Sequence, residues 1–201
     1  MSNIVIPVYF DYASTLCYVA WRIVGELERE LGFSALWKGV PIALRNYRSR
    51  PGMPLGPVEL GKIRNVAAET GVAVEPPARW LDSGKALQGS ELARDADVFA
   101  AYHDAVFLAA FEQRIDICHL GVLASIAATV GLEPKRFNDD IEQGRMAGRI
   151  AENVREADRS SALGYPTFVL GDFPLVGIQP TETMRKLLGR FIERRAAESQ
   201  A

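Results

Sequence analysis

Hydrophobic and polar positions follow two different periods along the first forty residues. Positions 8–11 are typical of a short strand, with Pro7 at or just before its first residue, where a missing N–H is tolerated. Over positions 14–31 the apolar residues fall on one stripe of a helix, and Gly32 suits the end of that helix. Apolar residues then alternate over 33–37, which indicates a second strand. This strand–helix–strand order is the unit that builds parallel sheets.

The middle of the chain is predicted to be mainly helical. Positions 46–57 are rich in Arg, Pro and Gly and indicate an irregular loop, which a helix over 58–70 follows. Further helices are predicted over 90–110, from an N-cap at Asp116, and from about Pro134. These segments do not repeat one another.

The last part of the chain returns to strands. Positions 166–170 and 173–176 predict two strands that the turn at 171–172 joins into a β-hairpin. An amphipathic helix is predicted from about Thr181. The full order is therefore β-α-β, a helical block, then β-β-α, which is the composition of a thioredoxin-like fold with helices inserted between its halves.

These elements predict an α/β fold in a single domain over residues 1–201. Its thioredoxin-like part would comprise approximately 1–45 and 160–201, and the helical insertion approximately 58–158.

Composition and charge narrow the class of protein. With 48% hydrophobic and 24% charged residues, the chain is typical of a soluble globular protein. A formal net charge of −2 gives no basic field, so neither a nucleic-acid nor a membrane partner is expected. Residues 1–10 have the pattern of a strand, so no export signal is expected there, and no run approaches the roughly 18 apolar residues that cross a bilayer. We therefore expect a cytoplasmic protein, and the sequence does not decide between a monomer and a homodimer.

The two cysteines, Cys17 and Cys118, have no Cys-x-x-Cys spacing. A structural disulfide is not expected in a reducing cytosol. Two cysteines and two histidines are too few for an ordinary structural zinc site, so no metal is expected and the adjacent Cys118 and His119 are interpreted as incidental. The chain has no P-loop and no Gly-x-Gly-x-x-Gly fingerprint, so no nucleotide is expected either.

Two segments resemble hallmarks of the DsbA superfamily. The sequence YFDYASTLCY at positions 9–18 resembles its strand-to-helix active-site turn, in which Cys-x-x-Cys occupies the positions of Ser14 to Cys17. The sequence GYPTF at 164–168 resembles the loop whose cis-proline, here Pro166, faces those cysteines.

Other segments extend this resemblance over nearly the whole chain. The sequences DAVF, DI and GL, at 104–107, 116–117 and 131–132, are similar to the helical insertion of cytosolic DsbA-like proteins. The sequence GIQP at 177–180 also fits that branch. The resemblance implies a DsbA-like architecture, with an all-helical subdomain inserted into a thioredoxin-like fold.

The chain departs from that family at Ser14, which replaces the first cysteine of the redox pair. The first thiolate of a dithiol enzyme attacks the substrate disulfide and the second resolves the mixed disulfide. A serine hydroxyl does not take the first role at neutral pH. Because Cys17 is kept, the leading hypothesis is a monothiol thiol–disulfide oxidoreductase with a degenerate Ser-x-x-Cys site, acting on a small-molecule thiol or a protein thiol.

Two other hypotheses stay open. Kappa-class glutathione transferases and 2-hydroxychromene-2-carboxylate isomerases share this architecture, and their serine lies next to the glutathione sulfur. The resemblance therefore also allows a glutathione-dependent isomerase or transferase, in which Ser14 stabilises the thiolate of the cofactor. A non-catalytic thioredoxin-fold module that binds peptides is the third.

The candidate residues follow from the same resemblance. Ser14 and Cys17 are the predicted catalytic residues. The predicted substrate-binding or glutathione-binding residues are Asp11, Tyr12, Thr15, Tyr165, Pro166 and Thr167.

Both catalytic candidates also have ordinary structural roles. Ser14 suits a helix N-cap, and Cys17 suits a small buried hydrophobe. The first turn of a helix lowers a thiol pKa and burial raises it, and the sequence does not decide between them. A triad of Ser14 with His103 and Asp104 is not expected, because the latter two lie within a predicted helix and no Gly-x-Ser-x-Gly elbow is present.

Overall fold

Four strands form one mixed sheet in the structure, a computed structural model that describes residues 4–44 and 50–198. The strands are β1 (Ile4–Phe10), β2 (Phe33–Gly39), β3 (Thr167–Leu170) and β4 (Phe173–Val176). Their order across the sheet is β2-β1-β3-β4. β1 pairs with β2 in parallel and with β3 antiparallel, and β3 and β4 form the expected hairpin. The sheet is therefore the predicted thioredoxin-like one, built from both ends of the chain.

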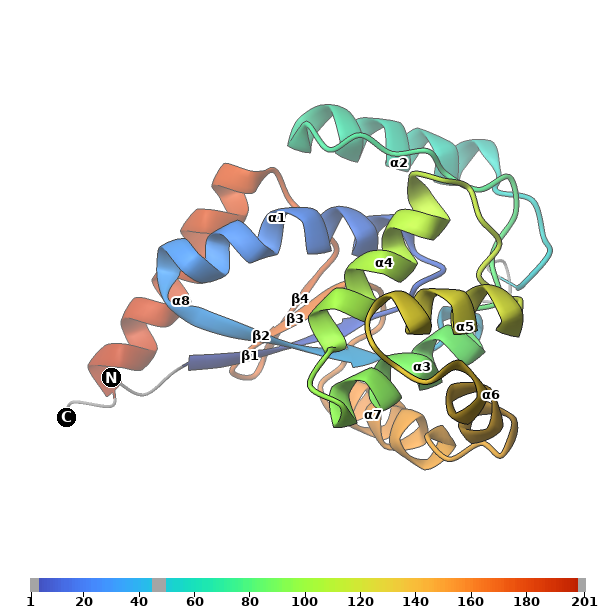
Figure 1. Cartoon of the computed structure of the whole chain (residues 1–201). Coiled ribbons are helices and arrows are strands. Elements are labelled where there is room, and N and C mark those ends of the chain that lie inside the picture. The colour runs from blue at the N-terminus through green and yellow to red at the C-terminus, as the bar shows by residue number, and fades with distance from the viewer. Residues whose placement is uncertain (1–3, 45–49, 199–201) are drawn as a thin grey trace.

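Most helices cover this sheet in two groups, and α2 packs against α1 on the side away from the sheet (Figure 1). Helix α1 runs across the sheet with α8 beside it, and α3 to α7 gather at one end, where α7 contacts β2. The helices are α1 (Thr15–Leu31), α2 (Pro57–Thr70), α3 (Gly84–Asp95), α4 (Phe99–Phe111), α5 (Leu120–Thr129), α6 (Pro134–Glu142), α7 (Ala147–Arg159) and α8 (Thr181–Glu198), with a 3₁₀ turn, η1, at Ile42–Leu44. This confirms the α/β fold with helices inserted between the two halves of a thioredoxin-like unit.

Helix α1 has the predicted ends. The Ser14 Oγ accepts a hydrogen bond from the N–H of Cys17 at 3.4 Å, which satisfies one of the free N–H groups in the first turn. Gly32 ends the helix in a left-handed conformation (φ 70°), and its N–H donates to the carbonyl of Glu28 at 3.0 Å. The sequence thus determines where α1 begins, with Ser14 as its N-cap, and where it ends, at Gly32.

The first strand is longer than predicted, because Pro7 lies inside it. β3 pairs only with Val8 and Tyr9, whereas β2 pairs with the whole of β1. At Pro7 the strand therefore has one neighbouring strand instead of two, and a missing N–H is tolerated there as it is on an edge strand.

The single helix predicted over 90–110 is wrong. Two helices, α3 and α4, are separated by a turn in which Asp97 adopts a positive φ of 57°, and the N–H of Val98 donates to the carbonyl of Ala93 at 2.9 Å. Aspartate tolerates this left-handed conformation better than most residues do. The apolar spacing continued across the turn and concealed it.

Two further differences lie in the inserted helices. Asp116 does not cap α5; its Oδ1 accepts the N–H of Cys118 at 3.0 Å in the preceding turn, and His119 is the N-cap residue. Helix α7 was not predicted, although Ile150, Val154 and Ala157 lie on one face of it at helical spacing and pack against the core. This apolar stripe is narrow and lies in a mainly polar segment, and it was overlooked in the sequence analysis.

A cluster of aromatic side chains surrounds His103, which is fully buried. We call it the His103 cluster; its rings belong to Phe10, Tyr12, Trp21, Trp37, Phe99 and Phe107. The hydroxyl of Tyr12 lies 2.8 Å from His103 Nδ1, while Nε2 has no hydrogen-bond partner in the described part of the chain. The cluster joins β1, α1, β2 and α4 and forms the centre of the core.

Gly89 allows the closest packing inside the insertion. A Cβ at this position would lie 2.8 Å from Cζ of Phe137 and nearer still to the hydroxyl of Tyr102. We expect Gly89→Ala to lower the free energy of unfolding by about 1–3 kcal/mol through overpacking. Gly25→Ala is the matched control, because nothing lies within 4 Å of its added Cβ and it should stabilise α1 by about 0.5–1 kcal/mol. Urea unfolding of both variants checks this, and a Gly89→Ala variant at least as stable as the parent protein would contradict the packing.

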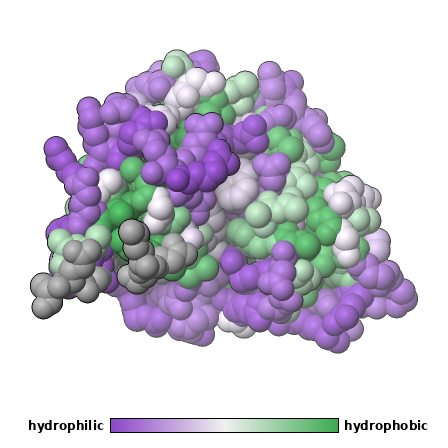
Figure 2. All heavy atoms as spheres, turned by 60° about the vertical axis from the view of Figure 1, so that its left-hand side comes forward, coloured by the Kyte–Doolittle hydropathy of each residue, from purple (hydrophilic) through white to green (hydrophobic). Residues whose placement is uncertain are grey.

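Hydrophilic side chains cover most of the face shown in Figure 2, and apolar side chains form separate patches between them. Over residues 4–44 and 50–198, no helix combines the length and the apolar character that a membrane span requires.

Candidate active site

The turn between β1 and α1 is anchored by Asp11, whose side chain is fully buried. Its carboxylate accepts hydrogen bonds from the N–H of Ala13 at 2.9 Å and from the N–H of Ile42 at 2.5 Å. Its carbonyl accepts the N–H of Ser14 at 3.0 Å. Burial raises the pKa of the carboxyl group, and the backbone hydrogen bonds oppose that rise. Asp11 thus attaches the turn that contains Ser14 to Ile42, in the chain segment that follows β2.

The loop before β3, which contains Tyr165 and Pro166, is held by hydrogen bonds of its own. The Tyr165–Pro166 peptide bond is cis. The carbonyl of Pro166 accepts the N–H of Gly177 at 2.7 Å, and the hydroxyl of Thr167 donates to the carbonyl of Gly164. These bonds tie the loop to the end of the β3–β4 hairpin.

Ser14 and Tyr165 line the same cavity, although 150 residues separate them in the sequence. Its volume is about 170 Å³. The lining residues are Ser14, Thr15, Leu16, Ile42, Leu55, Glu59, Lys62, Ile63, Trp80 and Tyr165. The two hallmark segments of the sequence therefore meet at one site.

The N-terminus of α1 presents several hydrogen-bond donors to this cavity. Ser14 Oγ accepts a backbone N–H through a lone pair and keeps its own proton to donate, either to a ligand in the cavity or to the neighbouring sulfur of Cys17. The N–H groups of Thr15 and Leu16 occupy the first turn, where a helix offers no acceptor, and they have none elsewhere in the described residues. Together with the positive end of the helix dipole, these donors favour an anion.

Cys17 has a different environment. Its side chain is fully buried and does not line the cavity. Burial raises the pKa of its thiol to about 12, and weaker hydrogen bonds from Ser14 and Asp11 oppose that rise. At pH 7 roughly one thiol in 100,000 would be ionised, so Cys17 is a poor nucleophile in this conformation.

The two cysteines should differ sharply toward an alkylating reagent. We expect iodoacetamide to modify the partly exposed Cys118 in the native protein and to reach Cys17 only after unfolding. Peptide mapping by mass spectrometry, before and after addition of denaturant, measures both rates. Comparable rates in the native protein would show that Cys17 becomes accessible.

The remaining predicted residues do not lie equally close to the cavity. Thr15 lines it, whereas Asp11, Pro166 and Thr167 support the two loops from behind. Tyr12 belongs to the His103 cluster, where its hydroxyl is engaged, and does not line the cavity. The first positions of the loop predicted over 46–57 lie outside the described residues.

Sequence reasoning missed most of the cavity wall. Leu55, Ile63 and Trp80 supply apolar surface, and α2 adds the charged side chains of Glu59 and Lys62 at the rim. The helix predicted over 58–70 was the only sequence signal for the residues of α2, and it did not indicate which element they face.

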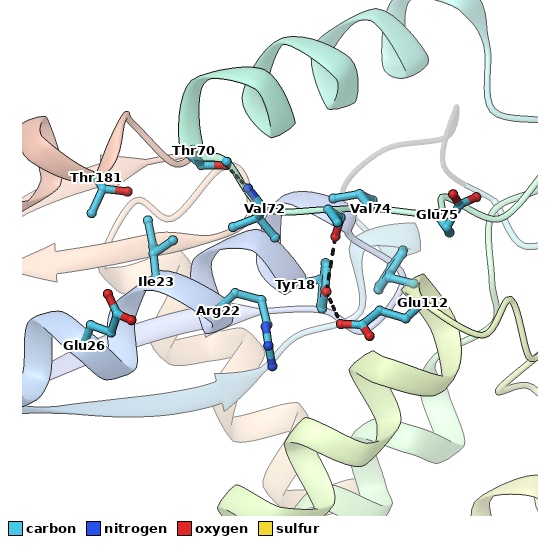
Figure 3. Close-up of a pocket in the computed structure, with 13 residues that line it drawn as sticks. Tyr18, Arg22, Ile23, Glu26, Thr70, Val72, Val74, Glu75, Glu112 and Thr181 are labelled. Carbon is cyan, nitrogen blue, oxygen red and sulfur yellow. Dashed lines mark hydrogen bonds between the residues drawn. The ribbon is translucent and has the colours of Figure 1, made fainter.

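A larger cavity, of about 770 Å³, lies along the flank of α1 (Figure 3). Tyr18 points into it and donates a hydrogen bond to Oε1 of Glu112 at 2.5 Å, with the carbonyl of Ala73 at 3.4 Å. Neither Ser14 nor Tyr165 lines this cavity, so it is separate from the site described above.

The fold and the site together define a class of protein: a thioredoxin-like domain with a helical insertion, in which a helix N-terminus faces a cis-proline loop. A family model described as a DsbA-like thioredoxin domain matches residues 5–189. The chain belongs to the DsbA-like thioredoxin domain family, as the resemblance implied.

Individual relatives are distant in sequence. The uncharacterized protein YwbO of Bacillus subtilis (strain 168) is 24% identical over 196 residues, which cover 91% of this chain and 94% of that protein. Among solved structures, a 2-hydroxychromene-2-carboxylate isomerase matches with a TM-score of 0.79 and 21% identity, over 96% of this chain and 98% of that chain. The cytosolic disulfide reductase DsbM from Pseudomonas aeruginosa, solved with GSH, matches with a TM-score of 0.68 and 18% identity, over 98% and 100% of the two chains. The similarities to solved structures support the thioredoxin-like fold with inserted helices.

Proposed function

We propose that this protein is a glutathione-dependent isomerase or transferase in which Ser14 stabilises the thiolate of glutathione. The observation that carries the proposal is the contrast between Ser14 and Cys17. Ser14 lines the cavity at the N-terminus of α1, whereas Cys17 is fully buried with a thiol pKa raised to about 12. A monothiol oxidoreductase, the leading hypothesis from the sequence, requires an accessible Cys17 whose thiol ionises readily.

The residues of the cavity suit a bound thiolate. Glutathione would supply a sulfur nucleophile, which a transferase adds to its substrate and an isomerase releases again. The Ser14 hydroxyl donates to the sulfur, and the N–H groups of Thr15 and Leu16 add the field of the helix terminus. A hydrogen bond to a charged group contributes about 1.5–3 kcal/mol, which corresponds to a lowering of the thiol pKa by roughly one to two units.

The volume of the cavity suits enclosure of only a part of glutathione. A volume of about 170 Å³ lies below the roughly 300–1,000 Å³ of pockets that enclose a drug-sized ligand. We therefore place the cysteinyl part inside, against the main chain of Tyr165, and the rest across the rim. Lys62, the cation among the lining residues, is available there for a carboxylate of glutathione.

Two relatives add support at the level of the fold. One is an isomerase by name and the other was solved with GSH. Neither similarity identifies the electrophile, which the apolar wall of Leu55, Ile63 and Trp80 would contact.

Isothermal titration of the protein with glutathione and with S-methylglutathione tests the proposal. We expect glutathione to bind without a covalent bond, the S-methyl compound to bind more weakly because it has no thiolate, and Cys17→Ala to retain binding. Mass spectrometry after exposure to oxidised glutathione is the complementary measurement. A mixed disulfide on Cys17 in the folded protein would instead support the monothiol oxidoreductase, and binding of extended peptides without glutathione would support a binding module.

A further inference from the structure

Three side chains of metal-ligand type meet at the turn before α5. One ligand atom each from Asp116, Cys118 and His119 lies within 4.8 Å of the other two. The sequence analysis counted cysteines and histidines alone and interpreted Cys118 and His119 as incidental. The structure adds a carboxylate to the pair and so completes a set of three different donors.

One pair of these donors, Asp116 and His119, is spaced nearly as in a tetrahedral site. Zinc bonds of 2.0–2.3 Å place neighbouring ligand atoms roughly 3.3–3.8 Å apart. His119 Nε2 lies 3.9 Å from Asp116 Oδ2 without any ion between them. Because the side chains of Asp116 and His119 are 53% and 71% exposed, small rotations are enough to close the site.

A local hydrogen bond orients the carboxylate of Asp116, and the imidazole of His119 is free of any capping bond. Asp116 Oδ1 accepts the N–H of Cys118 at 3.0 Å, which leaves Oδ2 on the side of His119. His119 stands at the N-cap position of α5 but makes no side-chain capping bond. Its imidazole is therefore not committed to holding the helix.

We propose that this turn binds a thiophilic divalent cation of the zinc class through Asp116, Cys118 and His119. On binding, the Cys118 thiol loses its proton to solvent as the metal–sulfur bond forms, while the imidazole binds in its neutral form. The thiolate and the carboxylate together balance the charge of the cation. Three protein ligands leave the fourth position to water, the arrangement of zinc sites that remain open to a further ligand. This site is independent of the glutathione site at Ser14.

Titration of the metal-free full-length protein with Co²⁺ tests the proposal, because Co²⁺ reports its ligands by absorption. We expect one equivalent to bind with a thiolate-to-metal charge-transfer band, and Zn²⁺ to displace it. Cys118→Ser should abolish the band. Asp116→Asn and His119→Asn should each weaken binding roughly tenfold or more, since even the outer partners of metal ligands contribute that much.

The variants separate ligand loss from misfolding. In Asp116→Asn the amide side chain retains an oxygen that can accept the N–H of Cys118, so the turn is preserved. Asp172→Asn, on an exposed hairpin turn, and Cys17→Ala, which leaves Cys118 as the one thiol, should both keep the band and the affinity. Absence of the band at saturating Co²⁺ in the parent, or unchanged affinity in both Asp116→Asn and His119→Asn, would overturn the proposal.

Discussion

Ser14→Ala should lower the affinity for glutathione roughly 10- to 150-fold, because it removes a hydrogen bond to a charged sulfur worth about 1.5–3 kcal/mol. The same change removes the N-cap of α1, whose hydroxyl accepts the N–H of Cys17. It should therefore also cost about 1 kcal/mol of folding free energy. Isothermal titration measures the first effect and urea unfolding the second.

Ser14→Asp separates these two roles. Aspartate caps a helix as well as serine does, so the free energy of unfolding should be maintained. A carboxylate beside the sulfur repels a thiolate, so glutathione binding should fall at least as far as in Ser14→Ala. Ser14→Thr keeps the hydroxyl and should retain most of the affinity. Normal glutathione binding by Ser14→Asp would contradict the role proposed for the hydroxyl.

Acidification should destabilise the protein through His103. Burial lowers the pKa of this imidazole well below its usual value, and the nearby charge of Arg94 adds to the effect. The unfolded chain therefore takes up a proton near pH 6.5 while the folded one does not. The stabilisation is complete above that pH and falls by up to about 1.4 kcal/mol for each pH unit below it. Two units of acidification would cost about 2.7 kcal/mol, a large part of the stability of a domain.

His103→Asn isolates this contribution. An asparagine oxygen can replace Nδ1 as the partner of the Tyr12 hydroxyl, but it does not titrate. The variant should be less stable at pH 7.5 because ring contacts are lost, and its free energy of unfolding should fall less steeply between pH 6.5 and 4.5. The comparison is needed because Asp11, whose pKa is raised, contributes with the opposite sign. His119→Asn, on the exposed histidine, is the control, with chelator present; an unchanged slope in His103→Asn would contradict the prediction.

Local sequence was sufficient for the elements with strong periodicity and clear ends. Helix α1 is an example, because Ser14 and Gly32 mark its ends and its apolar stripe fixes the buried face. The turn at Asp97 and helix α7 were missed, each for its own reason. Apolar spacing continued through Asp97 and concealed the turn. The apolar stripe of α7, at Ile150, Val154 and Ala157, is narrow in a mainly polar segment and was overlooked.

The site depended on contacts that no local pattern contains. The meeting of Ser14 and Tyr165 was implied by family resemblance, not by periodicity. The cavity wall at Ile63 and Trp80, and the burial of Cys17, follow from how α2 and the core pack against α1. Whether the helix terminus or burial controls the Cys17 thiol was open in the sequence; burial dominates its pKa in the structure.

The pKa of the glutathione thiol in the complex tests the central claim most directly. It can be followed by the carbon-13 shift of labelled cysteinyl carbons during a pH titration. Held at Ser14, this thiol should ionise at least about one unit below the value near 8.5 of a free cysteine, and the lowering should disappear in Ser14→Ala but persist in Cys17→Ala. An unshifted thiol pKa in the saturated parent protein would contradict the account.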